Sequence, residues 1–425
     1  MWRFLARPAC AYLCFLAVGP IAVAQNNLEP LSARIDLDAA LARALAENPD
    51  LVAFGYQLEA AEGRLRQAGL RPNPELGVTV EDALGNDTHR SIDRAETTVT
   101  LGWLLERGVR PRIVDAARAE LSLRTANANV VRLDVGAETA RRFLTCLAFQ
   151  ERLRMASLAV GQTEETVQLI SERVAAGRAL QAEQARAEAD LVRAELVQED
   201  YEHELLSAYH RLSAQWGLTQ PDFSSVSGDL RTLPTLEPFE ALLSRLDANP
   251  ERARLLSEER LAEAELRLAE ARRRPSWEVS AGIRRFELSD DLAVVGGITI
   301  PLPVRDRNQG RIAEARAEVQ RAYAETAASR VRIETALFVL YQELNHNLQL
   351  AARLETDVVP RLERALADTR RAYELGRSGY SEWRVVQTEL LDARSDRLQA
   401  SVEAHEILLE IERLTGVPVA REAPQ

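Results

Sequence analysis

Residues 48–74 read NPDLVAFGYQLEAAEGRLRQAGLRPNP, and residues 249–275 read NPERARLLSEERLAEAELRLAEARRRP. Both stretches open with Asn-Pro, close with Pro and share the pattern Ala-Glu-x-x-Leu-Arg-x-Ala, at an offset of 201 residues. Later in the chain Gly177 corresponds to Gly376, at an offset of 199. The repeated pattern, with an offset that changes by only two residues, indicates a tandem duplication with one short loop deletion. We therefore expect two units at 35–220 and 236–419, a turn-rich linker at 221–235 and a tail at 420–425.

Each unit is expected to begin with a helix and to continue as a β-hairpin. Asn48 and Asn249 suit helix N-caps because their side chains can accept backbone N–H hydrogen bonds, and the Pro that follows suits the first helical position. Beyond the closing Pro the apolar period changes from about 3.6 to 2, the period of a strand with one apolar face. The four expected strands are 75–82, 96–104, 276–285 and 292–300. Such strands fit either tilted membrane-crossing structure or a soluble two-sided sheet.

The rest of each unit predicts a long antiparallel coiled-coil hairpin, over about 111–216 and about 308–415. As one helix, residues 111–176 would be on the order of 100 Å long. Both return helices carry mostly apolar or small residues at alternating spacings of 4 and 3, which is a heptad seam. The seam residues are Ala187, Leu191, Ala194, Gln198, Tyr201, Leu205, Ala208 and Leu212, then Val386, Leu390, Ala393, Arg397, Ala400, Ala404, Ile407 and Ile411. Gly161 and Pro360 predict an interruption of each outgoing helix.

Residues 1–24 predict a secretory signal peptide. A short basic region precedes an apolar stretch, and Ala22-Val23-Ala24 is a cleavage signal. Removal of this segment takes Cys10 and Cys14 with it and leaves Cys146 as the remaining cysteine. We therefore expect no intramolecular disulfide and no lipid-modified cysteine.

Composition excludes several classes of function. The chain has 53 basic and 65 acidic residues, and its formal net charge of −12 is unsuited to nucleic-acid binding. All the basic residues are Arg, which excludes Schiff-base and P-loop lysine chemistry. The sequence also lacks GxSxG, HExxH and CxxC motifs, so we expect no enzyme activity, no cofactor and no resident metal. His203 and His210 share a helix face with Glu199, but solvated or interface histidines are the commoner interpretation of such a pattern.

This architecture resembles the TolC family of outer-membrane factors. The resemblance covers nearly the whole mature chain and includes LARALAENP at 41–49 and the glycines in the turns of the coiled coils. Ile-Pro-Leu-Pro at 300–303, followed by Arg-Asn-Gln-Gly at 307–310, is similar to the CzcC-like branch, the outer-membrane parts of heavy-metal efflux pumps. Residues 304–306 depart from that branch, whose members usually have an apolar-aromatic pair and Asn there.

The resemblance implies an assembly that combines helices with membrane β-structure. Three chains would form a 12-stranded outer-membrane β-barrel that continues into a periplasmic α-helical tunnel. The implied location is the outer membrane of a Gram-negative bacterium, with a large periplasmic part. The implied partners are two further copies of the chain, outer-membrane lipid, a periplasmic adaptor (membrane fusion protein) and an inner-membrane transporter of the resistance-nodulation-division type.

The resemblance also assigns roles to residues near the coiled-coil turns. Gly177 and Arg178, with Gly376 and Arg377, would form the hairpin tips on which the adaptor docks. As helix stops these glycines are also ordinary, because Gly suits the left-handed position after a helix. Glu382, and Glu183 in the first unit, would constrict the tunnel and favour cations through their summed field.

The sequence therefore predicts the outer-membrane channel of a tripartite efflux pump that exports divalent heavy-metal cations such as zinc, cadmium or cobalt. With only 2 Met, the chain is poorly suited to soft Cu(I) or Ag(I). One alternative is an outer-membrane channel of the same fold for multidrug efflux or type I protein secretion. A second alternative is a soluble periplasmic coiled-coil scaffold whose hairpins never enter lipid.

Overall fold

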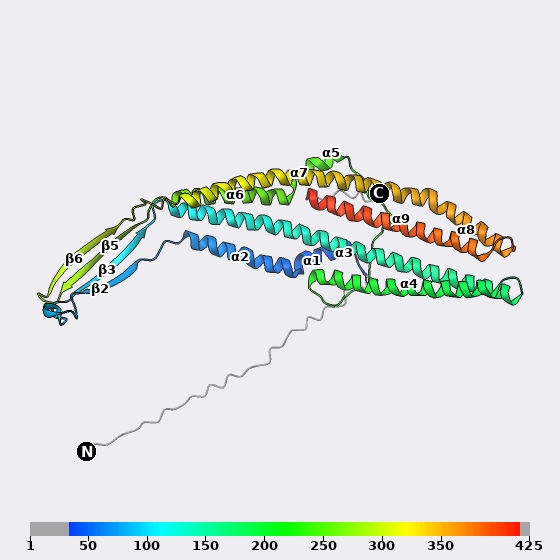
Figure 1. Cartoon of the computed structure of the whole chain (residues 1–425), viewed down its shortest axis with the longest axis horizontal. Helices are drawn as coiled ribbons and strands as arrows, with labels where there is room; N and C mark the ends of the chain where they lie inside the picture. The colour runs from blue at the N-terminus through cyan, green and yellow to red at the C-terminus, as the bar shows by residue number, and fades with distance from the viewer. Residues whose placement is uncertain (1–33, 417–425) are drawn as a thin grey trace, which may run out of the picture.

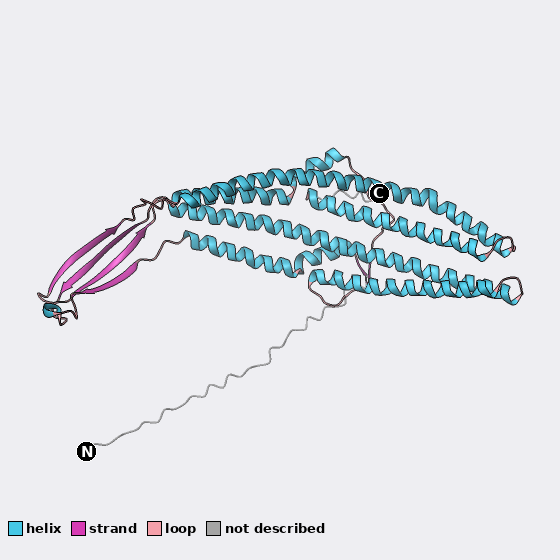
Figure 2. Ribbon diagram, viewed as in Figure 1, coloured by secondary structure: helices cyan, strands magenta, loops and turns pink. Residues whose placement is uncertain are grey.

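The computed structural model describes residues 34–416, so the expected signal peptide and tail lie outside the described residues. The chain is elongated, with a small sheet at one end and paired helices along the rest of its length (Figures 1 and 2). This arrangement confirms the predicted repeat of helix, β-hairpin and long antiparallel coiled-coil hairpin. None of the helices within 34–416 is both long enough and apolar enough to span a membrane.

Both units show the same order of elements. The first comprises β1 (Arg34–Ile35), α1 (Leu37–Glu47), α2 (Pro49–Gly69), β2 (Glu75–Glu81), η1 (Asp87–His89), β3 (Glu96–Leu105), α3 (Val109–Ala175), α4 (Gln181–Ser213) and η2 (Ala214–Trp216). Strand β4 (Ser225–Val226) lies in the linker. The second unit comprises α5 (Phe239–Arg245), η3 (Leu246–Ala248), α6 (Pro250–Ala271), β5 (Trp277–Phe286), β6 (Asp291–Thr299), α7 (Gln309–Arg353), the π-helical η4 (Leu354–Val358), α8 (Val359–Glu374) and α9 (Tyr380–Thr415).

The two hairpins join into one antiparallel sheet of order β2-β3-β5-β6. Its register separates two faces, because directly paired residues lie on the same side of a sheet. Leu101 pairs with Leu76, and Ile283 pairs with both Val99 and Val294, so apolar side chains from all four strands share one face. Val294 on this face is 88% exposed in the single chain. The opposite face carries mostly Thr, Ser, Gly and charged side chains.

The heptad seams hold the long helices together. Every predicted seam residue of α4 and α9 is buried or half-buried. In the second unit the outgoing helix is interrupted as expected: η4 lies just before Pro360, whose missing N–H removes one helical hydrogen bond. In the first unit the expected interruption at Gly161 is wrong. Helix α3 runs through this residue for 67 residues, because glycine keeps its backbone N–H and needs no break in the hydrogen-bond ladder.

The offset between equivalent residues of the two units falls from 201 to 199 in two steps. This corrects the expectation of a single loop deletion. Gly108 and Asn308 hold the equivalent N-cap positions of α3 and α7, both in the left-handed conformation, at an offset of 200. The offset is 201 at the Asn-Pro pairs and 199 at the tip glycines. One residue is therefore lost before the outgoing helix and another within it.

Two equivalent asparagines fasten the start of each unit to its end. Asn48 accepts the N–H groups of Asp50 and Leu51, while its Nδ2 donates to the carbonyl of Gln215 at 2.8 Å. In the second unit the Asn249 Nδ2 donates to the carbonyl of Leu414 at 2.6 Å. Each asparagine thus caps one helix and bridges to the end of another.

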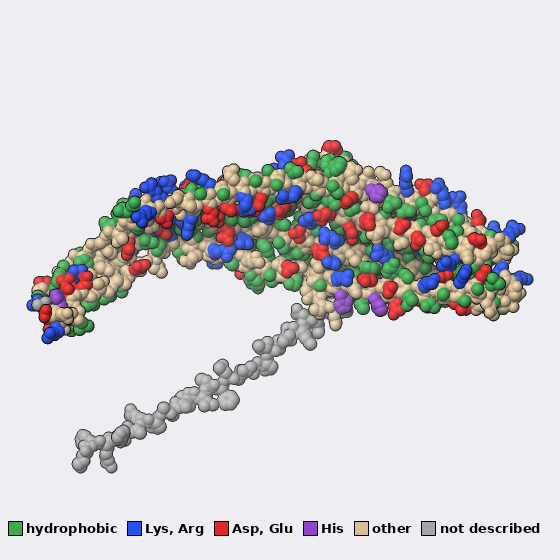
Figure 3. Space-filling view, in the orientation of Figure 1, with side chains coloured by type: hydrophobic (Ala, Val, Ile, Leu, Met, Phe, Trp, Pro, Cys, Tyr) green, Lys and Arg blue, Asp and Glu red, His purple; other side chains and the backbone are tan. Residues whose placement is uncertain are grey.

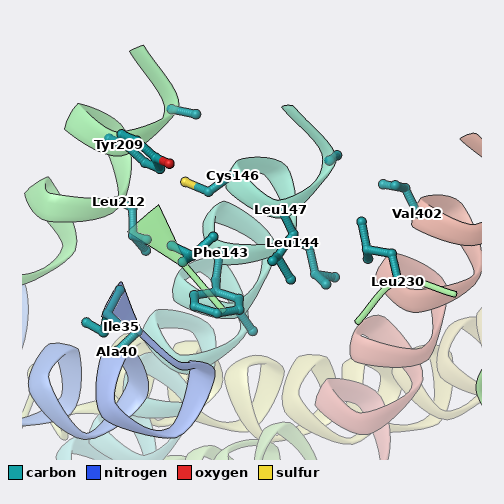
Figure 4. Packing of buried hydrophobic residues seen from close by; sticks show 14 of the residues in the cluster. Ile35, Ala40, Phe143, Leu144, Cys146, Leu147, Tyr209, Leu212, Leu230 and Val402 are labelled. Atoms are coloured by element: carbon teal, nitrogen blue, oxygen red, sulfur yellow. The ribbon is translucent and has the colours of Figure 1, made fainter. Parts of the chain in front are cut away.

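The main apolar core lies midway along the molecule, where the linker crosses the helices (Figure 1), and Figure 4 shows its packing from close by. Phe143 and Leu147 of α3 pack there with Leu212 of α4 and with Leu230 of the linker. Gln150 fixes the linker strand, because its side chain both accepts from the N–H and donates to the carbonyl of Val226, at 2.8 and 3.1 Å. The linker is therefore part of the core.

We expect Asn48→Ala to lower the free energy of unfolding by about 2–3 kcal/mol, since it removes the cap of α2 and leaves the Gln215 carbonyl without its donor. Thermal unfolding followed by circular dichroism measures the loss. Asp36→Ala is the control, because the Asp36 side chain caps α1 through Ala39 N and makes no other hydrogen bond within residues 34–416. That variant should lose only about 1 kcal/mol. Equal losses in the two variants would contradict the bridging role of Asn48.

Candidate functional site

The polar face of the sheet is lined with small side chains and one charged network. Gly282 lies opposite Thr100, and a Cβ added to it would stand 2.2 Å from the Val99 carbonyl oxygen. Strand backbones approach each other this closely only because glycine has no side chain. Near the end of the sheet remote from the helices, Arg284 contacts Glu96 at 2.7 Å and Glu81 at 3.1 Å. Small and charged groups of this kind suit a surface that faces water.

Both outer strands of the sheet have an unpaired edge in the single chain. Within the described residues, β2 pairs only with β3 and β6 pairs only with β5. An exposed edge presents a row of free backbone N–H and C=O groups, which is a template for pairing with another chain. Over residues 34–416, the sheet of a single chain therefore lacks a strand neighbour at both edges and a cover for its apolar face.

The two hairpin tips lie side by side at the opposite end of the molecule (Figure 1). Gly177 has φ +69° and Gly376 has φ +71°, the left-handed conformation that favours glycine. In the first tip the N–H groups of Gly177 and Arg178 donate to the carbonyls of Val174 and Arg173, which closes helix α3. The second tip repeats this arrangement. The tip arginines, Arg178 and Arg377, are both exposed, and neither forms an ion pair within residues 34–416.

An aromatic cluster connects the two tips, and sequence reasoning missed it. Tyr373, Tyr380 and Trp383 pack together against Ile170 of the first unit. Arg173 reaches across: its guanidinium lies 4.7 Å from the centroid of the Tyr373 ring and donates to the carbonyl of Glu374 at 2.8 Å. The aromatic residues of the second tip were the available signal, because the first tip has none at matching positions.

Polar contacts also connect the two coiled-coil hairpins just behind the tips. The hydroxyl of Tyr380 donates to Asp190 at 3.1 Å, and Arg384 lies 3.5 Å from the same carboxylate. Burial, followed by the nearby charge of Asp190, raises the pKa of Tyr380 well above its usual value, so the phenol stays protonated and can donate at physiological pH. The hairpins of one chain are thus tied at their ends.

The two glutamates expected at a constriction occupy equivalent positions in the first turns of α4 and α9. The exposed Glu382 accepts the N–H of Gly379 at 2.6 Å, which caps α9. Glu183 accepts the hydroxyl of Tyr373 at 3.2 Å. Both carboxylates therefore have local partners within one chain.

The described part of the chain contains no cluster of three or more His, Cys, Asp or Glu side chains suited to a metal ion. His210 is engaged elsewhere, since its Nδ1 lies 2.8 Å from the carbonyl oxygen of Thr219. Cys146 is buried, and this burial raises the pKa of its thiol to about 12. The thiol is therefore protonated at neutral pH and is a poor metal ligand.

Comparison with known proteins gives the fold and the family. Residues 40–218 match the family model described as Outer membrane efflux protein. The crystal structure of the outer membrane protein VceC from Vibrio cholerae has the same fold, with a TM-score of 0.74 and 20% identity over 90% of this chain and 96% of that chain.

Two relatives are similar in sequence. The "Nickel and cobalt resistance protein CnrC" of Cupriavidus metallidurans is 26% identical over 300 residues, 70% of each protein. The "Cobalt-zinc-cadmium resistance protein CzcC" of the same organism is 30% identical over 383 residues, 90% of each protein. The alternative of a soluble scaffold is thereby excluded. The chain belongs to the family of outer membrane efflux proteins.

Proposed function

We propose that this protein is the outer-membrane channel of a tripartite efflux pump that exports divalent cations, with zinc, cadmium and cobalt as the first candidates. The observation that carries the proposal is the 30% identity to a cobalt-zinc-cadmium resistance protein across 90% of both chains. An exporter has little need to hold its ion tightly. Passage of weakly held cations needs only a water-filled path with a favourable field.

The sheet supports a trimeric channel. One chain supplies four strands with an apolar face, a face of small and polar residues, and two free edges. If β6 of each copy pairs with β2 of the next, the contact is head-to-tail and closes as a ring. Three copies then form a 12-stranded barrel, with the apolar face toward lipid and the other toward the lumen. The α3–α4 and α7–α9 hairpins would continue the wall into the periplasm.

The tips support a docking role. Gly177, Arg178, Gly376 and Arg377 are all exposed at the end of the molecule farthest from the sheet. The two tip arginines lack carboxylate partners within the described residues and are free to pair with acidic groups of another protein. We assign these four residues to contact with a periplasmic adaptor, which connects the channel to an inner-membrane transporter of the resistance-nodulation-division type.

The constriction assignment rests on Glu382 and, in the first unit, Glu183. Glu382 is exposed in the single chain, although one of its carboxylate oxygens caps α9. Three such carboxylates around a threefold axis would attract cations to the entrance of the tunnel. Glu183 would contribute less to this attraction, because its carboxylate accepts a hydrogen bond from the hydroxyl of Tyr373.

Adjacent cysteines on β6 test the barrel. In lipid vesicles, a water-soluble maleimide should label Val295→Cys, which faces the lumen, and should leave Val294→Cys, which faces lipid, largely unlabelled. Cys146 gives little background because its buried thiol has a pKa raised to about 12. Wild type is the blank, and its mass in detergent should be that of a trimer. Labelling of Val294→Cys alone, or a detergent-free monomer, would overturn the barrel.

The double variant Gly177→Val, Gly376→Val tests the tips. A β-branched residue resists the left-handed conformation, at a cost of about 1–3 kcal/mol, so each tip should rearrange while the distant sheet stays intact. We expect trimer yield to persist while crosslinking to the adaptor and metal tolerance fall together. The control is Gly63→Val with Gly161→Val, which alters helical glycines with open space around them. If the tip variant crosslinks as well as this control, the glycines serve helix termination alone.

Deletion of the gene tests the cargo. Tolerance to at least one of zinc, cadmium and cobalt should fall, and should return when wild type is supplied from a plasmid. Tolerance to dyes, detergents and antibiotics should change little, because the proposed path selects by charge. Drug sensitivity with normal metal tolerance would instead assign the channel to multidrug efflux.

A further inference from the structure

Exposed arginines surround the junction between the sheet and the helices. All four connections between strands and helices meet at this end of the sheet, and blue side chains gather over the junction in Figure 3. Each connection contributes at least one exposed arginine, with a further one from the first turn of α7. We define the arginine collar as Arg71, Arg107, Arg273, Arg274, Arg305 and Arg311.

The collar brings together, at one place, six arginines without acidic partners in the described part of the chain, whereas other unpaired arginines are scattered along the helices and at the tips. Along the helices, arginines pair repeatedly with glutamate: Arg254, for example, contacts both Glu251 and Glu258. At the opposite end of the sheet, Arg284 lies between two glutamates. The structure of residues 34–416 gives no ion pair to any of the six collar arginines. Arginines outnumber the acidic residues Glu106 and Asp306 in these four connections, so the collar is a band of net positive charge.

Local helix stability does not explain this charge. The first turns of α3 and α7 contain no acidic residue, although carboxylates are the side chains that the positive end of a helix favours. Arg311 stands instead in the first turn of α7, where the helix dipole disfavours a cation. Arg311 therefore gains nothing from the dipole of α7, and its exposed guanidinium is available to an anion outside the chain.

The apolar face of the sheet ends directly at the collar. Leu105 and Trp277 form the last pair between β3 and β5, and Trp103 lies on the same face. The guanidinium of Arg107 is 4.4 Å from the centroid of the Trp277 ring. Tryptophan is enriched where a membrane protein passes from the hydrocarbon region to the lipid headgroups. Arginine just beyond such a tryptophan lies at the depth of the phosphates.

We propose that the arginine collar binds the phosphate groups of anionic phospholipids in the membrane leaflet that faces the helical body. The proposal rests on the proposed function only in placing the apolar sheet face in lipid. Guanidinium groups suit this ligand because their planar donors match the oxygens of a phosphate two at a time. Bound headgroups would fix the depth of the channel in the membrane and supply the charge that the collar lacks.

Quenching of tryptophan by brominated lipids tests the collar. The full mature protein is reconstituted with phosphatidylcholine and phosphatidylglycerol, each in turn carrying bromine on its acyl chains. Trp103 and Trp277 lie beside the lipid, whereas the buried Trp216 and Trp383 in the helical body give a constant background. Because bromine on the acyl chain quenches only when lipid is adjacent, the signal reports bound lipid and not free phosphate.

We expect wild type to prefer phosphatidylglycerol by at least about threefold in relative binding constant, and to lose part of that preference in high salt. The variant R273Q/R274Q/R305Q/R311Q should reduce the preference to about one. The matched control R132Q/R211Q/R353Q/R371Q removes the same charge from exposed helical arginines that have no ion pair within the described chain, and should keep the wild-type preference. Both variants are first shown to keep the wild-type helix content.

The experiment distinguishes a failure of the collar proposal from a failure of the proposed membrane placement of the sheet. Equal quenching by the two brominated lipids in wild type would overturn the collar proposal and leave the membrane placement intact. An equal loss of preference in the collar variant and in the control would show that overall charge, and not the collar, attracts the lipid. Absence of quenching by either lipid would overturn the membrane placement of the sheet, and with it both proposals.

Discussion

The heptad seam is the constraint on which the rest of the structure depends. Helix α3 runs for 67 residues, and for most of this length its main support is the helix or helices beside it. The seam of α4 is rich in alanine, and small side chains let two helix backbones approach closely along their whole length. A continuous seam makes each hairpin stiff enough to hold its tip far from the sheet. The separation between the sheet and the hairpin tips follows from this pairing.

Much of this architecture is local in origin and was therefore predictable from sequence. The Asn-Pro caps, the change of period after Pro74 and the seam residues each depend on neighbours in the chain, and the structure places them as expected. The prediction omits α1 and α5, which are short and take their stability from packing on the long helices. It also treats Gly161 and Pro360 as equivalent, whereas only the missing N–H of proline forces an irregular turn.

The tip contacts could not be predicted because they join residues from different units. Arg173 on the first hairpin meets Tyr373 on the second, and Asp190 meets Tyr380, over separations of about 200 residues that no periodicity encodes. These contacts also break the internal symmetry. The duplicated halves share caps and seams, but the aromatic cluster belongs to the second tip alone, so the two tips present different surfaces. A partner that docks on the proposed trimer would therefore meet the two kinds of tip in alternation.

The free edges of β2 and β6 have a consequence for biogenesis. In the proposed head-to-tail ring of three chains, a monomer and a dimer would each leave one β2 edge and one β6 edge unpaired. Only the addition of the third chain would pair both edges. Partly assembled species therefore carry strands that can pair with the wrong partner and aggregate. The yield of channel should depend on how quickly the third copy arrives compared with off-pathway association. Selection on such a chain acts on the kinetics of ring closure as well as on the stability of the finished ring.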